Sequence, residues 1–210
     1  MKLDFQPQKA QLIMKLRGMG IMDAATLAAL EQVPREFFVP QALRNHSYEN
    51  ASLPIAYDQT ISQPYVIARM TEALRLRGRE LVLEIGCGTG YQAAVLSHLC
   101  RRVYTMERLK PLLVDAENRL RDLRISNISF RHGDGSKGWP EVAPFDRIIL
   151  TCGCAKIPDI LLQQLKIGGI MVAPEGRDKS QQLLAITRHR NGFERVSLMH
   201  VTFVPLISGD

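Results

Sequence analysis

The chain has 210 residues, 46% of them apolar, which is enough to bury one hydrophobic core, so we expect a single domain over residues 1–210. No apolar run approaches the roughly 18 residues of a membrane span, and the start, MKLDFQPQKA, lacks the apolar core of a signal peptide, which together predict a cytoplasmic protein without a membrane partner. The formal net charge of +6 comes with arginines spread along the expected helices and strands instead of a basic run, so we expect no nucleic-acid partner.

Residues 1–78 have the pattern of a helical and loop region. Apolar residues recur at helical spacing over residues 12–16 and again over 27–30. Asp23 is a candidate N-cap for the second of these helices. Residues 40–64 are rich in proline and hydroxyl side chains, which predicts a long loop without regular structure.

Residues 79–210 have the pattern of alternating strands and helices. Short apolar runs (LVLEIG, VYTME, NISF, FDRIILT and IMVAP) are the expected strands, and helices are expected to begin at Gln92 and Lys110. Two further strands flank Asn191-Gly192, a pair typical of the type I′ turn of an antiparallel hairpin. The expected fold class is α/β, with a doubly wound, mostly parallel Rossmann-like sheet, helices on both faces and antiparallel C-terminal strands.

The segment LEIGCGTGY places a glycine-rich turn between the first of these strands and its helix. Glycine lacks a Cβ, so a ligand can touch the backbone of Gly86, Cys87, Gly88 and Gly90 directly. A dinucleotide fingerprint would need a glycine one position after Gly90, and the chain has a tyrosine there. A Gly-x-Gly-x-Gly turn that follows a strand with an acid near its end therefore favours S-adenosylmethionine as the ligand. We expect Glu84 to lie near the amino-acid tail of this cofactor.

Two more acids are expected at the ends of the next two strands. Glu107 follows Gly86 by 21 residues, the distance at which an acid meets ribose hydroxyls in this architecture. Asp134 lies in a Gly-Asp-Gly turn that suits an adenine amino group. Because ligands of open α/β sheets bind at the carboxyl ends of strands, we predict one cofactor site, which also includes Arg108, Gly135 and Thr151. No cysteine pair or histidine has zinc-ligand spacing, so no metal site is expected.

At this point the chain resembles the protein-L-isoaspartate O-methyltransferases over almost its whole length. The resemblance is carried by VPREFFVPQAL, LPI, QTISQPYVIARMTEAL, LEIGCGTGYQAAVL, RHGDGSKGW, APFDRIILT and VTFVPL. Within these motifs, QTISQP is the most specific, since glycine-rich cofactor turns occur in many methyltransferases.

The resemblance implies methyl transfer from S-adenosylmethionine to the free carboxylate of isoaspartyl residues in damaged proteins, with S-adenosylhomocysteine as the second product. A carboxylate is already ionised at neutral pH, so the reaction needs positioning more than a general base. The resemblance assigns Ser62 to hold one carboxylate oxygen, with Thr60 as support, and Ile61, Gln63 and Val204 to bind the substrate peptide. From the absence of an exposed apolar stripe we expect a monomer.

The chain also departs from the pattern of this family. It has Ala56-Tyr57-Asp58 where the family usually has Gly-x-Gly, and Cys152-Gly153-Cys154 where small alanines are commoner. These departures keep two alternatives open: a methyltransferase for another acceptor, such as a modified peptide or an RNA base, and a cofactor-binding protein without turnover. The segment after the fourth expected strand, ILTCGCAKIP, lacks the Asn/Asp-Pro-Pro-aromatic motif that methylation of amines uses, which disfavours nucleobase amines.

Overall fold

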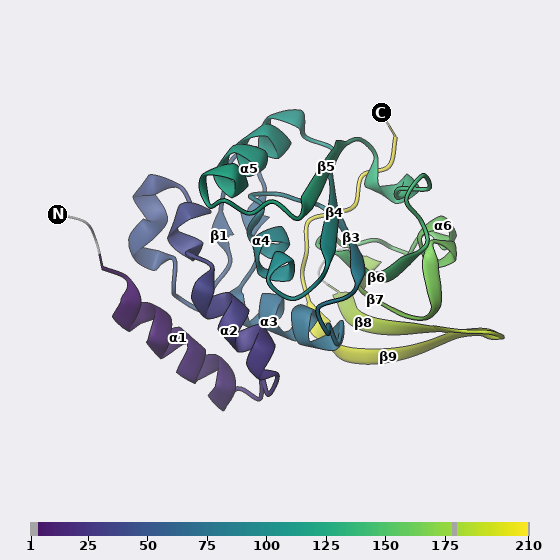
Figure 1. Cartoon of the computed structure of the whole chain (residues 1–210), viewed down its shortest axis with the longest axis horizontal. Helices are drawn as coiled ribbons and strands as arrows, with labels where there is room; N and C mark the ends of the chain where they lie inside the picture. Colours follow the sequence, from purple (N-terminus) through teal and green to yellow (C-terminus); the bar gives the residue numbers. More distant parts are fainter. Residues whose placement is uncertain (1–3, 178–179, 210) are drawn as a thin grey trace.

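The computed structural model describes residues 4–177 and 180–209 and is built around a seven-stranded sheet (Figure 1). The strands of this sheet are β3 (Leu81–Ile85), β4 (Arg102–Glu107), β5 (Ile128–His132), β6 (Phe145–Leu150), β7 (Leu165–Arg177), β8 (Ser180–His189) and β9 (Gly192–Val201). Their order is β5-β4-β3-β6-β7-β8-β9, with parallel pairing from β5 to β7 and antiparallel pairing of β8 and β9. This is the predicted doubly wound sheet with antiparallel C-terminal strands.

Six α-helices accompany the sheet within the described residues: α1 (Gln6–Gly18), α2 (Ala24–Gln32), α3 (Pro64–Ala73), α4 (Tyr91–Ser97), α5 (Lys110–Asp122) and α6 (Asp159–Gln163). The carboxylate of Asp23 accepts a hydrogen bond from the backbone N–H of Thr26 at 2.9 Å, which confirms the predicted N-cap of α2. None of the helices in the described part of the chain has the length and apolar content that a membrane crossing requires.

The two faces of the sheet are covered unequally. Successive residues of β3 point to opposite faces, so Val82 joins one apolar cluster while Leu83 and Ile85 join another. The larger cluster lies under α1 to α5 and includes residues from both the 1–78 region and the sheet, whereas the smaller cluster lies under α6. The N-terminal helices are thus packed against the sheet instead of forming an appendage (Figure 1).

Two local predictions are wrong. Residues 40–64 contain a 3-10 helix (Gln41–His46) and a short antiparallel pair, β1 (Leu53–Pro54) with β2 (Thr60–Ile61), because burial of Leu53 and Ile61 favours backbone pairing there. The predicted β8–β9 hairpin is confirmed, but its register pairs His189 with Gly192, so the turn residues are Arg190 and Asn191. Neither has a positive φ, which excludes the type I′ turn.

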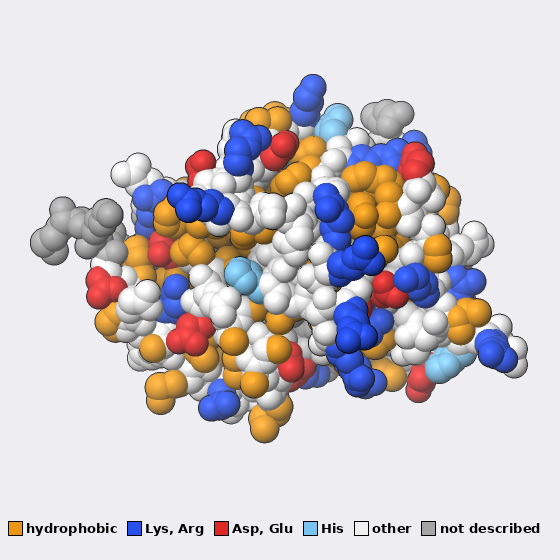
Figure 2. All heavy atoms as spheres, in the orientation of Figure 1, with side chains coloured by type: hydrophobic (Ala, Val, Ile, Leu, Met, Phe, Trp, Pro, Cys, Tyr) orange, Lys and Arg blue, Asp and Glu red, His pale blue; other side chains and the backbone are white. Residues whose placement is uncertain are grey.

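Positive side chains gather at the amino ends of β3 and β4. The loops before these strands carry exposed Arg75, Arg77, Arg79 and Arg101, and Figure 2 shows Lys and Arg side chains in a band over this part of Figure 1. Arg147 on β6 donates hydrogen bonds to the carbonyls of Leu74 and Arg75 at the same place. Arginines that are scattered along the sequence thus come together at this edge of the sheet, which is opposite the strand ends considered next.

Candidate active site

The carboxyl ends of β3, β4 and β5 meet at one pocket of about 230 Å³, which we call the inner pocket. Its lining comprises Asp58, Gln59, Ile85, Gly86, Met106, Glu107, Arg108, Leu109, Gly133, Gly135, Cys152 and residues 204–207. Residues predicted from three separate strand ends, including Gly86, Glu107 and Gly135, thus line the same space. Parallel strands bring these ends together because all their carboxyl ends lie at one edge of the sheet.

The glycine-rich turn has backbone angles that only glycine adopts readily. Gly86 has a φ of 97°, and a Cβ at this position would collide with Thr151 Oγ1. Gly88 has a φ of 52°, and a Cβ there would meet no heavy atom within 4 Å. The turn therefore presents open backbone at Gly88, as contact with a bound ligand requires.

The carboxylate of Glu107 is held in place by two backbone groups. Its Oε2 accepts a hydrogen bond from the N–H of Gly88 at 2.9 Å, and its Oε1 accepts one from the N–H of Leu109, also at 2.9 Å. A carboxylate oxygen has two lone pairs, so each oxygen retains one for a further donor. This arrangement can accept both hydroxyl protons of a ribose.

Asp134 follows β5 and is fixed in a similar way. Its Oδ1 accepts from the N–H of Ser136 at 2.8 Å and its Oδ2 from the N–H of Gly209 at 3.0 Å. Burial opposes ionisation, but the hydrogen bonds from Gly209 and Ser136 outweigh it and lower the pKa of Asp134. The Asp134 side chain is thus an ionised acceptor. It does not itself line the inner pocket, but its neighbours Gly133 and Gly135 do.

Glu84 is not where the sequence predicted it. Its side chain is 0% exposed, accepts a hydrogen bond from Thr105 Oγ1, and lines none of the cavities described here. Burial raises the pKa of Glu84 to about 8, more than the Thr105 hydrogen bond lowers it. Glu84 is thus a largely neutral acid inside the sheet that does not reach the cofactor pocket. The alternation of side chains along β3 points it beneath the glycine turn.

A small cavity of about 60 Å³, the junction cavity, connects the glycine turn with the predicted catalytic loop. It is lined from one side by Gly86, Cys87, Gly88 and Glu107, and from the other by residues 59–62 together with Thr151 and Val204. Burial raises the pKa of the Cys87 thiol well above its usual value, so this side chain is a neutral thiol. Segments separated in sequence by the whole of α3 therefore face each other across the junction cavity.

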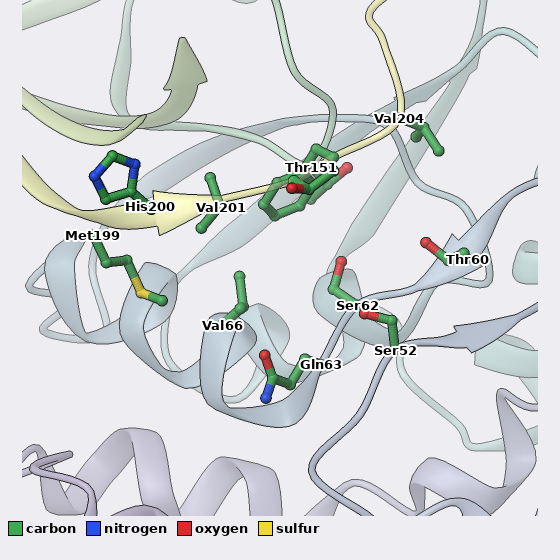
Figure 3. A pocket seen from close by; sticks show the side chains of 12 residues that line it. Ser52, Thr60, Ser62, Gln63, Val66, Thr151, Met199, His200, Val201 and Val204 are labelled. Atoms are coloured by element: carbon green, nitrogen blue, oxygen red, sulfur yellow. The ribbon is translucent and has the colours of Figure 1, made fainter. Parts of the chain in front are cut away.

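A wider cleft of about 360 Å³, the outer cleft, shares Thr60, Ser62, Thr151 and Val204 with the lining of the junction cavity. Its lining comprises Ser52, Thr60, Ser62, Gln63, Val66, Thr151 and residues 199–204. Figure 3 shows the hydroxyl of Ser62 directed into the space between the first turn of α3 and the end of β9. Ser62 thus borders both the junction cavity and the outer cleft, and Thr60 lies beside it.

Of the predicted substrate-binding residues, Gln63 and Val204 line the outer cleft, whereas Ile61 lines the junction cavity. Val204 lines all three cavities, and its carbonyl accepts a hydrogen bond from the N–H of Gly153 at 2.8 Å. The amide of Gln63 donates to the carbonyl of Asn50 at 2.9 Å and so serves the fold. Ile61 is buried and faces the junction cavity.

Gln92 is a candidate site residue that the sequence argument missed. It lies in the first turn of α4, lines the junction cavity and donates to Thr71 Oγ1 at 3.0 Å. Its Oε1 is buried and has no hydrogen-bond partner among the described residues. An unpaired buried acceptor beside the glycine turn suits the ammonium group of an amino-acid tail. Only its position two residues after the last glycine could have indicated this.

The departures at residues 56–58 and 152–154 lie at the site. Tyr57 and Asp58 have φ values of 60° and 54°, a left-handed conformation that favours glycine, and Asp58 lines the inner pocket. Cys152 also lines the inner pocket, and burial raises the pKa of both Cys152 and Cys154. Cys152 and Cys154 are both free thiols. Among the described residues, no group of three or more His, Cys, Asp or Glu side chains could hold a metal ion.

Comparisons with known proteins agree with this geometry. A family model described as protein-L-isoaspartate(D-aspartate) O-methyltransferase (PCMT) matches residues 7–210. The protein-L-isoaspartate O-methyltransferase of Maricaulis maris is 52% identical over 204 residues, covering 97% of this chain and 96% of its own length. The enzyme of that name from Dictyoglomus thermophilum is 49% identical over 203 residues, covering 97% of this chain and 92% of its own length.

Two solved structures are similar in fold. One, a protein-L-isoaspartate O-methyltransferase, has a TM-score of 0.84 and 28% identity, covering 96% of this chain, which spans 66% of that longer chain. The other, a putative protein-L-isoaspartate O-methyltransferase from Plasmodium falciparum in complex with S-adenosyl-L-homocysteine, has a TM-score of 0.80 and 24% identity, covering 94% of this chain and 97% of its own.

Proposed function

The chain belongs to the protein-L-isoaspartate O-methyltransferase family, and from that premise we infer that it methylates the free carboxylate of isoaspartyl residues in proteins, with S-adenosylmethionine as methyl donor. The observation that carries this inference is the junction cavity, across which Ser62 faces the glycine turn. A donor pocket and a hydroxyl-bearing acceptor loop must meet at such a point for one-step transfer.

Residues of the inner pocket and the junction cavity, together with Asp134 next to Gly135, fit this cofactor. Glu107 offers two fixed acceptor oxygens to the ribose, Asp134 offers an acceptor to the adenine amino group, and Gln92 offers its unpaired Oε1 to the ammonium tail. Gly88 leaves open backbone between them. When bound, S-adenosylmethionine supplies an electrophilic methyl group with a neutral thioether as leaving group.

On the acceptor side, the residues bind and orient an acid that is already ionised. The Ser62 hydroxyl donates a hydrogen bond to one carboxylate oxygen and so directs the other toward the junction cavity. Thr60 supports the same loop, and Ile61 and Val204 contact the peptide around the acceptor. No proton has to be removed before attack, so none of these residues acts as a general base.

The outer cleft also limits what the acceptor can be. It is open along residues 199–204 and lined by few charged side chains, so it suits an extended peptide segment more than a compact fold. An isoaspartyl residue inserts an extra carbon into the backbone and is compatible with such a segment. The ester then closes to a succinimide as the backbone amide nitrogen attacks it and methanol leaves, so methylation initiates repair.

Methyl transfer to matched peptides tests the proposal. We expect label from S-[methyl-³H]adenosylmethionine to appear in an isoaspartyl peptide, base-labile as an ester should be, and not in the same peptide with ordinary aspartate. Equal labelling of both peptides would support a methyltransferase with another acceptor. Tight binding of S-adenosylhomocysteine without labelling of either peptide would support a cofactor-binding protein without turnover. The expected monomeric state and the absence of nucleic-acid and membrane partners stay predictions.

A further inference from the structure

Arg35 is a buried cation that the reaction described above does not use. It lies in the 3-10 helix Arg35–Phe37 and is 0% exposed. Its Nε donates a hydrogen bond to the carbonyl of Ser47 at 2.8 Å, and its Nη2 donates to the carbonyl of Ser62 at 2.9 Å. Burying a guanidinium is unfavourable unless its contacts compensate for lost hydration, so this position calls for an explanation.

The contacts of Arg35 join the two halves of the site. Its guanidinium lies over the ring of Tyr91, with 4.8 Å between the guanidinium carbon and the ring centre. Tyr91 is the first residue of α4 and directly follows the glycine turn. The planar guanidinium of Arg35 therefore contacts both the carbonyl of Ser62 and the first residue of α4, the helix that follows the glycine turn.

The charge of Arg35 is not neutralised within the described part of the chain. No carboxylate there forms an ion pair with it. The neighbouring acid, Glu36, accepts a hydrogen bond from the hydroxyl of Tyr48 instead. Burial lowers the pKa of Arg35, while Tyr91 and Tyr48 raise it, and a guanidinium with an ordinary pKa of 12.5 remains charged at neutral pH.

A buried positive charge next to Ser62 favours an anion at the neighbouring cavity, because the surroundings screen the field less than water does. The acceptor in the proposed reaction is such an anion. A neutral analogue of the same shape would gain nothing from this field.

We propose that Arg35 is a positioning residue for methyl transfer, which fixes Ser62 relative to the glycine turn and whose buried charge favours an ionised carboxylate at the Ser62 hydroxyl. The proposal rests on the proposed function and deepens it. Arg35 makes two contributions, the geometry of two hydrogen bonds and the presence of one charge. A lysine removes the first alone, and a comparison of methionine with lysine isolates the second.

The geometric contribution is tested with Arg35→Lys, which keeps the charge but cannot reach both carbonyls. We expect kcat with the isoaspartyl peptide to fall at least tenfold, with the Kd of S-adenosylhomocysteine within twofold of that of the unchanged protein. The matched control is Arg147→Lys, since Arg147 also donates to backbone carbonyls but at the opposite edge of the sheet. Its kcat should stay within twofold even if its Tm falls. A kcat of Arg35→Lys within twofold of the unchanged protein overturns the proposal.

The charge contribution is tested with Arg35→Met, compared with Arg35→Lys. The probes are a fluorescent isoaspartyl peptide and its carboxamide counterpart, titrated into protein saturated with S-adenosylhomocysteine so that no turnover occurs. The unchanged protein and Arg35→Lys should prefer the acid over the amide, and Arg35→Met should lose at least fivefold of that preference. An undiminished preference in Arg35→Met overturns the electrostatic role.

Two features keep the outcomes distinct. If Arg35→Met fails to bind S-adenosylhomocysteine because it does not fold, the kcat of Arg35→Lys alone decides. If the unchanged protein does not methylate the isoaspartyl peptide, the proposed function itself has failed, and the assay without any variant shows this.

Discussion

The hydroxyl of Ser62 is available for a hydrogen bond to a substrate. The backbone carbonyl of Ser62 accepts a hydrogen bond from Arg35, whereas no described residue forms a hydrogen bond with Ser62 Oγ. We predict that Ser62→Ala lowers kcat at least tenfold, since removal of one fixed donor at a developing reaction centre costs about that much or more. The Kd of S-adenosylhomocysteine, measured by calorimetry, should change less than twofold. Ser52→Ala, in the same outer cleft, is the control, and an equal loss in both variants would contradict a specific role.

Glu84 makes stability depend on pH. The pKa of Glu84 is raised from 4.5 to about 8 in the folded protein, so between these values the folded state retains a proton that the unfolded chain has lost. The free energy of unfolding therefore falls as pH rises from about 4.5 to about 8. Glu84→Gln removes this pH-dependent loss of stability while it preserves the shape of the side chain.

The corresponding measurement is the Tm of the unchanged protein and of Glu84→Gln from about pH 4.5 to about pH 9. We expect the Tm of Glu84→Gln to exceed that of the unchanged protein by a margin that grows with pH and reaches about 3 °C or more at pH 9, since roughly 1 kcal/mol corresponds to about 2–4 °C for a domain of this size. Glu117→Gln on the exposed surface of α5 should show no such trend. A margin independent of pH would mean that Glu84 is not protonated in the fold.

At the scale of elements, two glycines of the turn between β3 and α4 have different roles: Gly86 is needed for the fold and Gly88 for ligand binding. A Cβ on Gly86 would collide with Thr151 Oγ1, whereas a Cβ on Gly88 would meet open space. We predict that Gly86→Ala lowers both Tm and cofactor affinity. Gly88→Ala should lower Tm less, by the modest penalty of a positive φ, yet weaken S-adenosylhomocysteine binding at least tenfold. Calorimetry of both variants checks this, and an equal loss of Tm would contradict the distinction.

At the scale of the whole molecule, the apolar cluster that spans residues 1–78 and the sheet predicts cooperative unfolding. Trp139 is the only tryptophan and packs against Tyr104 of β4 with 5.4 Å between ring centres, so its fluorescence reports on the sheet. Helical circular dichroism reports on α1 to α5. We predict that the two signals change at the same urea concentration. Separate transitions would mean that the N-terminal helices form an independent unit.

Much of the fold followed from local pattern. The alternation of apolar runs with amphipathic segments predicted β3 to β6 and helices α4 and α5 to within a residue at their starts, whereas β7 begins at Leu165, five residues before the predicted run IMVAP. Gly86, Glu107 and Asp134 could be placed together in advance because the carboxyl ends of parallel strands share one edge. The short β1–β2 pair and the hairpin turn at Arg190 and Asn191 were missed, since tertiary burial and strand register decide both.

The sequence by itself determined the order of strands and helices, the glycine turn and the acids at strand ends, because these depend on periodicity and on residues close in the chain. Only the tertiary structure decided that Glu84 points beneath the turn, that Gln92 reaches the junction cavity, and that Arg35 is buried against Ser62 and Tyr91. Packing between distant elements sets these relations; the Arg35 side chain, for example, binds the carbonyl of Ser62, 27 residues further along the chain.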